Sequence, residues 1–351
     1  MIRAGLVGFG LGGRVFHAPL LSSVEGLELA AVVERNSDNA AARYPGITTY
    51  RTLDAMLADS SLSLIVVSTP SGTHFDLVRQ ILKAGKNVVV DKPVAVTSEE
   101  VAELMRLAAK KNLLLAPFHE RRWDSDFLTL QKLLGESPLG RLVYFESTHD
   151  RWRPATRVAW KDDPSQGGGL LLDLGTHLAD QALLLFGKPE AVSAEVLSER
   201  DAAVADDSYT LRLRYPGLCV TLSANCLSSL ARPRFHLRGI KGNYWKWGLD
   251  PQESALNLVT RIDSPTWGQE PSSSWGTLSV DVDGGMVVRP VKPIPGDYRL
   301  YYAAVRDALL GTAPAPVAAL DAWRVARLLE WAVESSTKRR EIACDWSEEP
   351  N

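Results

Sequence analysis

Short apolar runs alternate with helical patterns along the first third of the chain. Helical spacing appears over His74–Ala84, which Gly85 stops, and over Ser98–Lys111. The apolar runs predict buried strands at Ile2–Val7, Leu27–Val33, Leu64–Val67, Asn87–Val90 and Leu113–Phe118. Strands that alternate with helices predict right-handed crossovers and a parallel sheet covered on both faces.

The second of these helices has a clear start signal. Thr97-Ser98-Glu99-Glu100 forms a capping box, in which the Thr97 and Glu100 side chains each accept a hydrogen bond from the other's free backbone N–H. We therefore predict that the helix begins at Ser98.

After Phe118 the pattern changes to alternating polar and apolar positions. Tyr209–Tyr215 alternates, turns at Pro216-Gly217 and continues through Leu218–Leu222, which predicts a hairpin in a sheet with one covered face. Further strands are predicted at Arg141–Ser147, Ala191–Leu197, Arg234–Leu237 and Met286–Val288, and closing helices at Tyr298–Leu310 and Asp321–Ser335. The chain thus divides into an α/β domain over residues 1–118 and an α+β domain over residues 119–351.

Length and charge support two ordinary globular domains. The chain has 351 residues, and its 39 Lys and Arg against 42 Asp and Glu give a net charge of −3. A chain with this near-zero net charge has no strong positive potential to attract the negatively charged phosphates of a nucleic acid. We therefore expect no nucleic-acid partner. The uninterrupted apolar runs are too short for a membrane span, and the first residues lack the features of a signal peptide. Three cysteines, Cys219, Cys226 and Cys344, form no metal or disulfide pattern and suit a cytoplasmic location.

A glycine-rich turn follows the first predicted strand. Gly8-Phe9-Gly10-Leu11-Gly12-Gly13 matches the GxGxxG pattern at Gly8, Gly10 and Gly13, and it precedes a predicted helix. In such turns the first glycine permits the sharp bend, the second lets the backbone approach a diphosphate, and the third allows close packing of helix and strand. The context predicts a Rossmann dinucleotide-binding domain, with the diphosphate at the helix N-terminus.

The end of the second strand bears on which dinucleotide binds. Glu34 lies there, 21 positions after Gly13, where a carboxylate accepts hydrogen bonds from the adenosine ribose and repels a 2′-phosphate. Arg35 and Ser37 follow, and an arginine at this point accommodates such a phosphate. Both NAD and NADP therefore stay open as cofactors, and the carboxylate favours NAD.

Two further strand ends belong at the same edge of the sheet, where ligands of parallel sheets bind. The first is the segment Ser68-Thr69-Pro70-Ser71-Gly72-Thr73-His74, and the second is Asp91-Lys92-Pro93. Charged residues in turns are commonly solvated. Lys92, however, falls where the nicotinamide end of the cofactor is expected.

An Asp–His pair lies within an apolar helix of the second domain. Asp173 and His177 are four positions apart in a helix that runs to Phe186 and ends at Gly187, so their side chains share a face. A hydrogen-bonded core pair and a catalytic pair both fit this pattern. A metal site is disfavoured, because no second His or Cys stands at a ligand spacing.

Together these motifs resemble the glucose–fructose oxidoreductase/inositol dehydrogenase/MocA-type family. The matching residues are the glycine turn, Thr69-Pro70, Asp91-Lys92-Pro93 and Asp173 with His177. The segments His119–Leu128 and Asp150–Pro154 are similar to the subgroup that contains scyllo-inositol 2-dehydrogenase. Family members usually have Glu-Lys-Pro, so Asp91 is shorter by one methylene. Several relatives in the subgroup carry a short polar residue in place of Glu34.

The resemblance implies a fold and an activity. It implies a C-terminal domain with a largely antiparallel open sheet, whose free face commonly pairs subunits, so a homo-oligomer is expected. It also implies NAD(P)-dependent hydride transfer at a CH–OH group of a cyclic polyol or sugar, with Lys92, Asp173 and His177 as the catalytic residues. His177 would exchange the hydroxyl proton and Lys92 would stabilise the alkoxide. We expect Lys92 to link the two domains at one cleft.

Other residues complete the predicted site. The cofactor residues are Gly8, Phe9, Gly10, Leu11, Gly12, Gly13, Glu34, Arg35, Thr69, Pro70, Ser71, His74, Asp91 and Lys92, and candidate substrate residues are Glu120, Arg121, Trp123, Arg153 and Trp160. His119 is a further pocket candidate. Two alternatives stay open: an NADPH-dependent sugar carbonyl reductase, and a non-catalytic dinucleotide-sensing regulator of the same fold.

Overall fold

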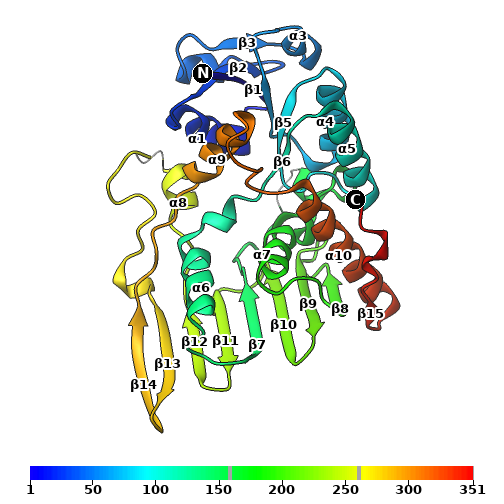
Figure 1. Cartoon of the computed structure of the whole chain (residues 1–351). Coiled ribbons are helices and arrows are strands. Elements are labelled where there is room, and N and C mark those ends of the chain that lie inside the picture. The colour runs from blue at the N-terminus through cyan, green and yellow to red at the C-terminus, as the bar shows by residue number, and fades with distance from the viewer. Residues whose placement is uncertain (157–159, 259–261, 351) are drawn as a thin grey trace. The chain divides into compact units, whose positions relative to one another are not determined.

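The computed structural model describes residues 1–156, 160–258 and 262–350, which form two compact units (Figure 1). The first unit comprises Met1–Glu120, Gln252–Trp267 and Asp297–Trp323, and the second comprises Arg121–Pro251, Gly268–Gly296 and Arg324–Asn351. The first passage between the units falls within two residues of the boundary expected at Phe118. The expected division differs further along, because two later segments return to the first unit.

The first unit is built on a parallel sheet, as predicted. Among its described residues the sheet has six strands in the order β3-β2-β1-β4-β5-β6. Their bounds are β1 Ile2–Val7, β2 Leu27–Val33, β3 Thr48–Tyr50, β4 Leu64–Val67, β5 Asn87–Asp91 and β6 Leu115–Phe118. All five predicted strands are confirmed, and the short edge strand β3 is additional.

Helices cover both faces of this sheet. The glycine turn leads into a wide π-helical turn, Gly13–His17, and then α1, Ala18–Ser23. The other helices are α2 Asn39–Arg43, α3 Leu53–Leu57, α4 His74–Lys83, α5 Ser98–Lys111, α8 Gln252–Asn257 and α9 Arg299–Leu309. Figure 1 shows α4 and α5 on one side of β5, with α1 and α9 on the other. The Thr97–Glu100 capping box is present as predicted.

The predicted start of β6 was two residues early. Leu113 still takes part in the cap that ends α5, because its N–H donates to the carbonyl of Ala108 while Asn112 takes a left-handed conformation with φ 53°. This arrangement satisfies the last carbonyls of the helix before the chain extends. The strand therefore begins only at Leu115.

Helix α9 completes the core of the first unit from far along the chain. The ring of Tyr301 packs edge-on against Phe118 with centroids 4.9 Å apart, and its hydroxyl donates to the carbonyl of Ala116. Tyr302 is fully buried, and its hydroxyl lies 2.6 Å from Nδ1 of His17. These contacts explain why residues 297–323 belong to the first unit although they follow most of the second unit's strands.

The second unit contains a mixed sheet, largely antiparallel as the resemblance implied. In the described part of this unit nine strands follow the order β14-β13-β12-β11-β7-β10-β9-β8-β15, and the pairing of β7 with β10 is parallel. The strands are β7 Leu142–Thr148, β8 Ala191–Leu197, β9 Ser208–Tyr215, β10 Leu218–Asn225, β11 Phe235–Gly239, β12 Gly242–Lys246, β13 Gly276–Val282, β14 Gly285–Val291 and β15 Ile342–Ala343. The predicted hairpin is β9–β10, and β12, β13 and β15 were not predicted.

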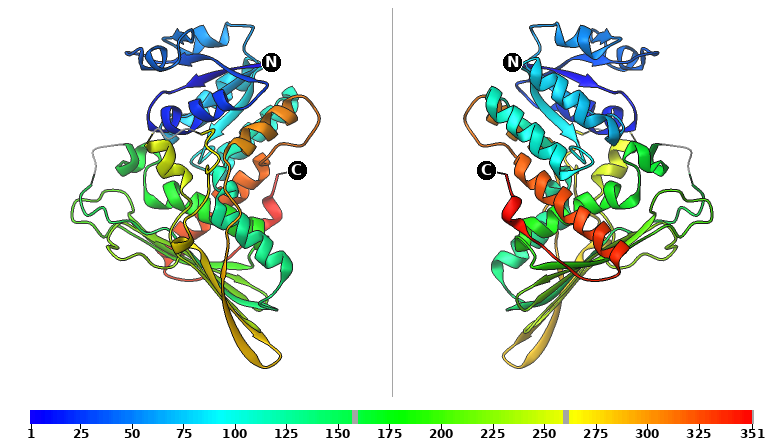
Figure 2. Two further views of the ribbon diagram at one scale, coloured as in Figure 1. Left: turned by 90° about the vertical axis from the view of Figure 1, so that its left-hand side faces the viewer. Right: turned by 90° about the vertical axis from the view of Figure 1, so that its right-hand side faces the viewer.

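Three helices cover one face of this sheet: α6 Ser125–Glu136, α7 Thr176–Phe186 and α10 Ala319–Lys338 (Figure 2). Phe127, Leu178 and Leu328 from these helices join one core with Phe145 and Leu211 from the strands. On β9 the alternate side chains Thr210, Arg212 and Arg214 are exposed, so they point to the opposite face. The oligomer expected through that face stays a prediction.

Candidate functional site

The turn after β1 has the features of a phosphate-binding loop. Gly8 has φ 95°, a left-handed conformation that disfavours any side chain. A Cβ on Gly13 would lie 2.1 Å from the carbonyl oxygen of Gly8, so the start of the helix packs directly on the strand end. A Cβ on Gly10 would meet nothing within 4 Å. The backbone at Gly10 is therefore bordered by open space, which a diphosphate requires at this position.

The other turn residues serve different purposes. Phe9 packs edge-on against Tyr44 with ring centroids 6.3 Å apart, and Leu11 is 59% exposed. A Cβ on Gly12 would lie 2.5 Å from Oγ of Ser68 and 3.1 Å from Oδ2 of Asp91. Gly12 thus brings the turn close to the ends of β4 and β5.

Glu34 is buried, and its carboxylate is bound by its own loop. Oε1 accepts a hydrogen bond of 2.7 Å from Oγ of Ser37, and Oε2 accepts one of 2.8 Å from the N–H of Ala40 in the first turn of α2. Each carboxylate oxygen has a second lone pair, so a ribose hydroxyl could still bind. The position at the end of β2 agrees with the prediction, whereas the use of both oxygens to shape the loop was not predicted.

The loop after β2 is bound by the Arg51 side chain and leaves Arg35 exposed. Arg51 donates to the carbonyls of Glu34 and Ser37, and it pairs with the Asp38 carboxylate at 2.8 Å. Arg51 is therefore committed to the loop backbone. Arg35 is exposed beside Glu34.

The loop after β4 is tied to the loop after β5 through a buried histidine. The His74 ring nitrogens lie 2.7 Å from the carbonyl of Pro93 and 2.8 Å from that of Thr69. Burial lowers the pKa of His74, against the raising effect of these carbonyls and of Asp91. Ser71 is buried within the same loop. His74 thus holds Thr69-Pro70 in place, and its predicted cofactor role would be exerted through this loop.

Asp91 connects three parts of the first unit. Its Oδ1 accepts a hydrogen bond from the N–H of Lys92, and its Oδ2 lies 3.4 Å from Oγ of Ser68 and 3.5 Å from Nε2 of His17. Burial raises the pKa of Asp91, but His17 together with the charges of Lys92 and His74 outweighs it and holds the pKa at about 2. Asp91 is therefore a carboxylate that fixes the backbone from which the Lys92 side chain projects.

In the second unit, the helix that carries the Asp–His pair begins in a tightly packed glycine segment. A Cβ on Gly168 would lie 2.5–2.7 Å from three backbone carbonyls, and Gly169 has φ 115°. The Asp206 carboxylate then accepts a hydrogen bond of 2.6 Å from the N–H of Leu171. This acceptor satisfies a free donor at the helix start, as an N-cap residue does.

Asp173 and His177 occupy consecutive turns of this helix. Asp173 lies in a π-helical turn, Leu171–Gly175, that continues directly into α7, where His177 is buried with 3% exposure. The Asp173 carboxylate is held by Nζ of Lys161 at 2.9 Å and by Nη1 of Arg151 at 3.4 Å. Two cations therefore orient Asp173. Wide helical turns of this kind occur often at functional sites.

His149 adds a second buried imidazole to this region. Burial holds the pKa of His149 well below its usual range, and the positive charges of Arg121, Arg151 and Arg234 lower it further, against Asp173. His149 is therefore neutral at physiological pH. Sequence reasoning treated it as a lone histidine, and only the fold shows that cations surround it.

The predicted substrate residues fall in both units. Glu120 is buried in the first unit, and Arg121 is buried in the second, with Nη1 3.4 Å from Oδ2 of Asp124. Arg153 is exposed, and Trp160 is half-buried with Nζ of Lys161 5.6 Å from its ring centroid. Trp160 therefore adjoins Lys161, which binds Asp173, and the substrate role of all five candidates, Trp123 included, stays a prediction.

Several residues of this region were not singled out as site residues from the sequence. Arg151 lies within the segment Asp150–Pro154 that resembles the family, and this resemblance could have pointed to it. Nothing in the sequence pattern pointed to Lys161, Asp206 or Arg234. Within residues 1–156, 160–258 and 262–350, no group of three or more His, Cys, Asp or Glu side chains is placed to hold a metal ion. One helical stretch in that described part, Pro164–Phe186, has the length and composition of a membrane span, and most of it is buried inside the structure.

The Asp206 cap predicts a pH dependence of stability. Burial raises the pKa of Asp206 to about 6, against the lowering effect of the Leu171 N–H. Since the folded-state pKa lies above the unfolded one, this group contributes stability at low pH that is lost as the pH rises through about 6. Asp206→Asn keeps the acceptor oxygen and removes the titration. We expect the free energy of unfolding of the wild type to fall by about 1–2 kcal/mol relative to the variant between pH 5 and pH 8.

Urea unfolding of both proteins at the two pH values measures this difference. Parallel pH profiles for the two proteins would show that Asp206 does not titrate in this range.

The parallel sheet, the glycine turn and the residues at the carboxyl ends of its strands define a dinucleotide-binding oxidoreductase. Two family models match the chain: residues 2–119 match the oxidoreductase family's NAD-binding Rossmann fold, and residues 131–344 match its C-terminal alpha/beta domain. The chain therefore belongs to the glucose–fructose oxidoreductase/inositol dehydrogenase/MocA family of NAD-binding oxidoreductases.

Relatives cover nearly the whole chain. It is 40% identical over 343 residues to the uncharacterized oxidoreductase YdgJ of Escherichia coli, covering 98% of both chains. It is 33% identical over 341 residues to the scyllo-inositol 2-dehydrogenase (NADP(+)) IolW of Bacillus subtilis, covering 97% of this chain and 95% of IolW. The solved structure of an oxidoreductase from Yersinia pestis, 41% identical, covers 97% of both chains with a TM-score of 0.92.

Proposed function

We propose that this protein is an NAD(P)-dependent dehydrogenase that oxidises a CH–OH group of a cyclic polyol or sugar, with scyllo-inositol as the model substrate. The observation that carries the proposal is the Asp173–His177 pair, in which the Asp173 carboxylate is held by Arg151 and Lys161 one helical turn from a buried histidine. A pair oriented in this way can bind a hydroxyl and exchange its proton.

The first unit fits a nicotinamide dinucleotide. The open space at Gly10 suits the diphosphate, Glu34 and Arg35 stand where the adenosine ribose is expected, and the loops after β4 and β5 follow at the same edge of the sheet. When bound, the nicotinamide supplies the hydride acceptor that oxidation of an alcohol requires. Thr69, Pro70 and Lys92 are assigned to hold it at that edge.

Proton transfer is assigned to His177 and charge stabilisation to Lys92. Oxidation removes a proton from the substrate oxygen as the hydride leaves its carbon, and an imidazole can accept that proton near neutral pH. The Lys92 ammonium donates a hydrogen bond to the same oxygen and stabilises its developing negative charge. Because two cations hold the Asp173 carboxylate, we assign Asp173 to orienting the substrate or His177 rather than to carrying the proton. In the reverse direction the same groups would reduce a carbonyl.

The choice between NAD and NADP depends on Glu34 and Arg35. The buried Glu34 carboxylate disfavours a 2′-phosphate, whereas the exposed Arg35 can pair with one, so we propose use of both cofactors with NAD preferred. We expect Arg35→Ala to lower kcat/KM with NADP by about tenfold, the loss of one charge-assisted contact, and to change kcat/KM with NAD by less than about twofold. Equal losses with both cofactors would contradict this role for Arg35.

A turnover assay tests the proposed function. The absorbance of the reduced nicotinamide is followed with NAD and with NADP over a panel of inositols, aldoses and deoxysugars. Turnover on a cyclic polyol or a sugar supports the proposal. Tight cofactor binding without turnover on any member of the panel would instead identify a dinucleotide-sensing protein.

A further inference from the structure

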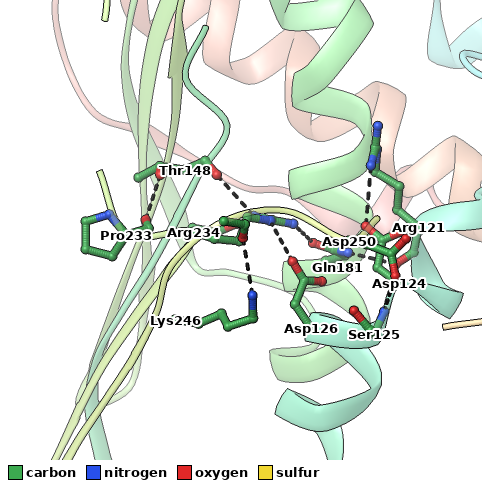
Figure 3. A network of polar contacts seen from close by, with 12 residues as sticks. Arg121, Asp124, Ser125, Asp126, Thr148, Gln181, Pro233, Arg234, Lys246 and Asp250 are labelled. Atoms are coloured by element: carbon green, nitrogen blue, oxygen red, sulfur yellow. Dashed lines mark hydrogen bonds and ion pairs between the residues drawn. The ribbon is translucent and has the colours of Figure 1, made fainter. Parts of the chain in front are cut away.

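Arg234 joins three elements of the second unit, α6, α7 and the end of β7. Its guanidinium donates to Oγ of Ser147 on β7. It also donates to the carbonyl of Thr148 at the end of β7 and, at 2.7 Å, to Oε1 of Gln181 on α7 (Figure 3). Its Nε lies 3.5 Å from Oδ2 of Asp126 on α6. The Arg234 side chain is only 2% exposed, so this fork of contacts lies inside the unit.

Gln181 links Arg234 to the face of α7 from which His177 projects. It follows His177 by four positions, so the two side chains project from the same side of the helix. Its Oε1 accepts from Arg234, and its Nε2 donates to the carbonyl of Arg121 at 2.9 Å. Both ends of the amide are therefore used, and rotation of α7 about its axis would break both bonds.

The same guanidinium fixes the strand end that leads to the partner of Asp173. Thr148 is bound through its carbonyl by the Arg234 side chain, and its N–H donates to the Arg234 carbonyl at 3.0 Å. Three residues further along the chain, Arg151 pairs with Asp173. Arg234 thus constrains both sides of the pair, α7 directly and the segment after β7 through Thr148.

Stability alone is a weak explanation for a buried arginine here. Transfer of a guanidinium into the interior carries a large desolvation penalty, and apolar groups of similar volume often stabilise a protein as well or better. The Asp126 carboxylate, 0% exposed, has no hydrogen-bond partner for either oxygen among the described residues, so this ion pair does not compensate fully. The planar guanidinium does, however, donate hydrogen bonds in fixed directions to several acceptors at once, so it can hold those acceptors in one arrangement.

We propose that Arg234 and Gln181 are positioning residues for proton transfer at His177. They fix the rotation of α7 and the end of β7, so that His177 and Asp173 keep the geometry that the reaction needs. This inference rests on the proposed function only for the identity of the reaction, since the positioning itself is a property of the second unit.

Two substitutions and one matched control test the proposal. Arg234→Lys keeps the charge and removes the fork, and Gln181→Met keeps the volume and removes both hydrogen bonds. The control is Arg122→Lys, because Arg122 forms a bidentate pair with Asp180, the neighbour of Gln181 on α7, with distances of 2.8 and 2.6 Å. All three changes remove buried polar contacts to the same helix.

We expect kcat on the polyol substrate to fall by about 10- to 100-fold in Arg234→Lys and in Gln181→Met, since small misplacements of reacting groups have effects of this size. The KM for the cofactor should stay within about twofold. Arg122→Lys should keep kcat within about threefold at a similar loss of melting temperature. Equal losses of kcat in all three variants would assign Arg234 a purely structural role and overturn the proposal.

Histidine imidazole NMR gives a readout that needs no turnover. The His177 resonance is assigned by its loss in His177→Gln, and we expect it to move in Arg234→Lys and in Gln181→Met but not in Arg122→Lys. An unchanged His177 resonance in both test variants overturns the positioning role, whatever the kinetics show. If the wild type turns over no substrate while this resonance moves, the proposed function fails and the positioning role stands. If Arg234→Lys does not fold, Gln181→Met decides by the same two measurements.

Discussion

Replacing His177 with glutamine is expected to lower kcat for polyol oxidation by about 10²- to 10⁴-fold, the range that general acid–base groups supply. Glutamine preserves a hydrogen-bonding side chain of similar length but cannot accept a proton at neutral pH. Because His177 is assigned to the substrate hydroxyl and not to the cofactor, the dissociation constant of the cofactor should stay within about twofold. Steady-state absorbance assays and a cofactor fluorescence titration measure the two quantities.

A histidine outside the site serves as the control. His236 lies on β11 and stacks on Trp245 with ring centroids 4.0 Å apart, and we expect His236→Gln to retain kcat within about twofold.

Lys92→Met should also lower kcat strongly. If Lys92 and His177 act in one step, the double variant Lys92→Met/His177→Gln should lose less kcat than the product of the two single losses. A His177→Gln enzyme that retains more than a third of the wild-type kcat would contradict the assignment.

Alanine at Gly10 is expected to weaken cofactor binding, whereas alanine at Gly13 is expected to lower stability. At Gly10 a Cβ has open space around it, so folding should be unchanged, while the added methyl group occupies the approach of the diphosphate. We expect the dissociation constant of the cofactor to rise by about 100-fold or more, which corresponds to about 2.7 kcal/mol. At Gly13 a Cβ would lie 2.1 Å from the Gly8 carbonyl, so the free energy of unfolding should fall by about 2–4 kcal/mol.

Cofactor titration and urea unfolding of the two variants separate these effects, and each variant is the control for the other. Wild-type cofactor affinity in Gly10→Ala would show that the diphosphate does not bind at this turn. Unchanged stability in Gly13→Ala would show that the helix start can move away from the strand.

The sequence predicted strands whose burial is uniform and strands such as β9, whose burial alternates along eight residues. Strands such as Val88–Val90 are apolar throughout because helices cover both faces, and this leaves an unbroken pattern. The strands that it missed lack this signature. β3 is three half-buried or exposed residues at a sheet edge, β12 begins at a glycine and alternates Tyr244 with Trp245, and β15 has two residues. Their pairing is set by neighbours distant in the chain, which a local pattern does not contain.

The candidate site divides in the same way. The glycine turn and the spacing of Asp173 and His177 are local features, and the structure places them on the expected elements. The contacts around the pair are not local: Lys161 and Arg151, which hold the Asp173 carboxylate, lie 12 and 22 positions from it. Arg234, which binds α7, lies 53 positions from Gln181. Glu34 shows the converse. Its position was predictable, but the binding of both its oxygens by Ser37 and Ala40 depends on how one loop folds back.

The return of residues 297–323 to the first unit has a consequence for dissecting this protein. Each unit consists of three separate segments in alternation, so the chain passes between the units five times. A fragment that ends near Phe118 would contain the whole glycine turn and the strands, yet it would lack Tyr301 and Tyr302, which cover Phe118 and His17. The residues of the dinucleotide-binding motif are therefore contiguous in the sequence, but the unit that folds around them is not. An exchange of cofactor domains between relatives would have to include helix α9 as well.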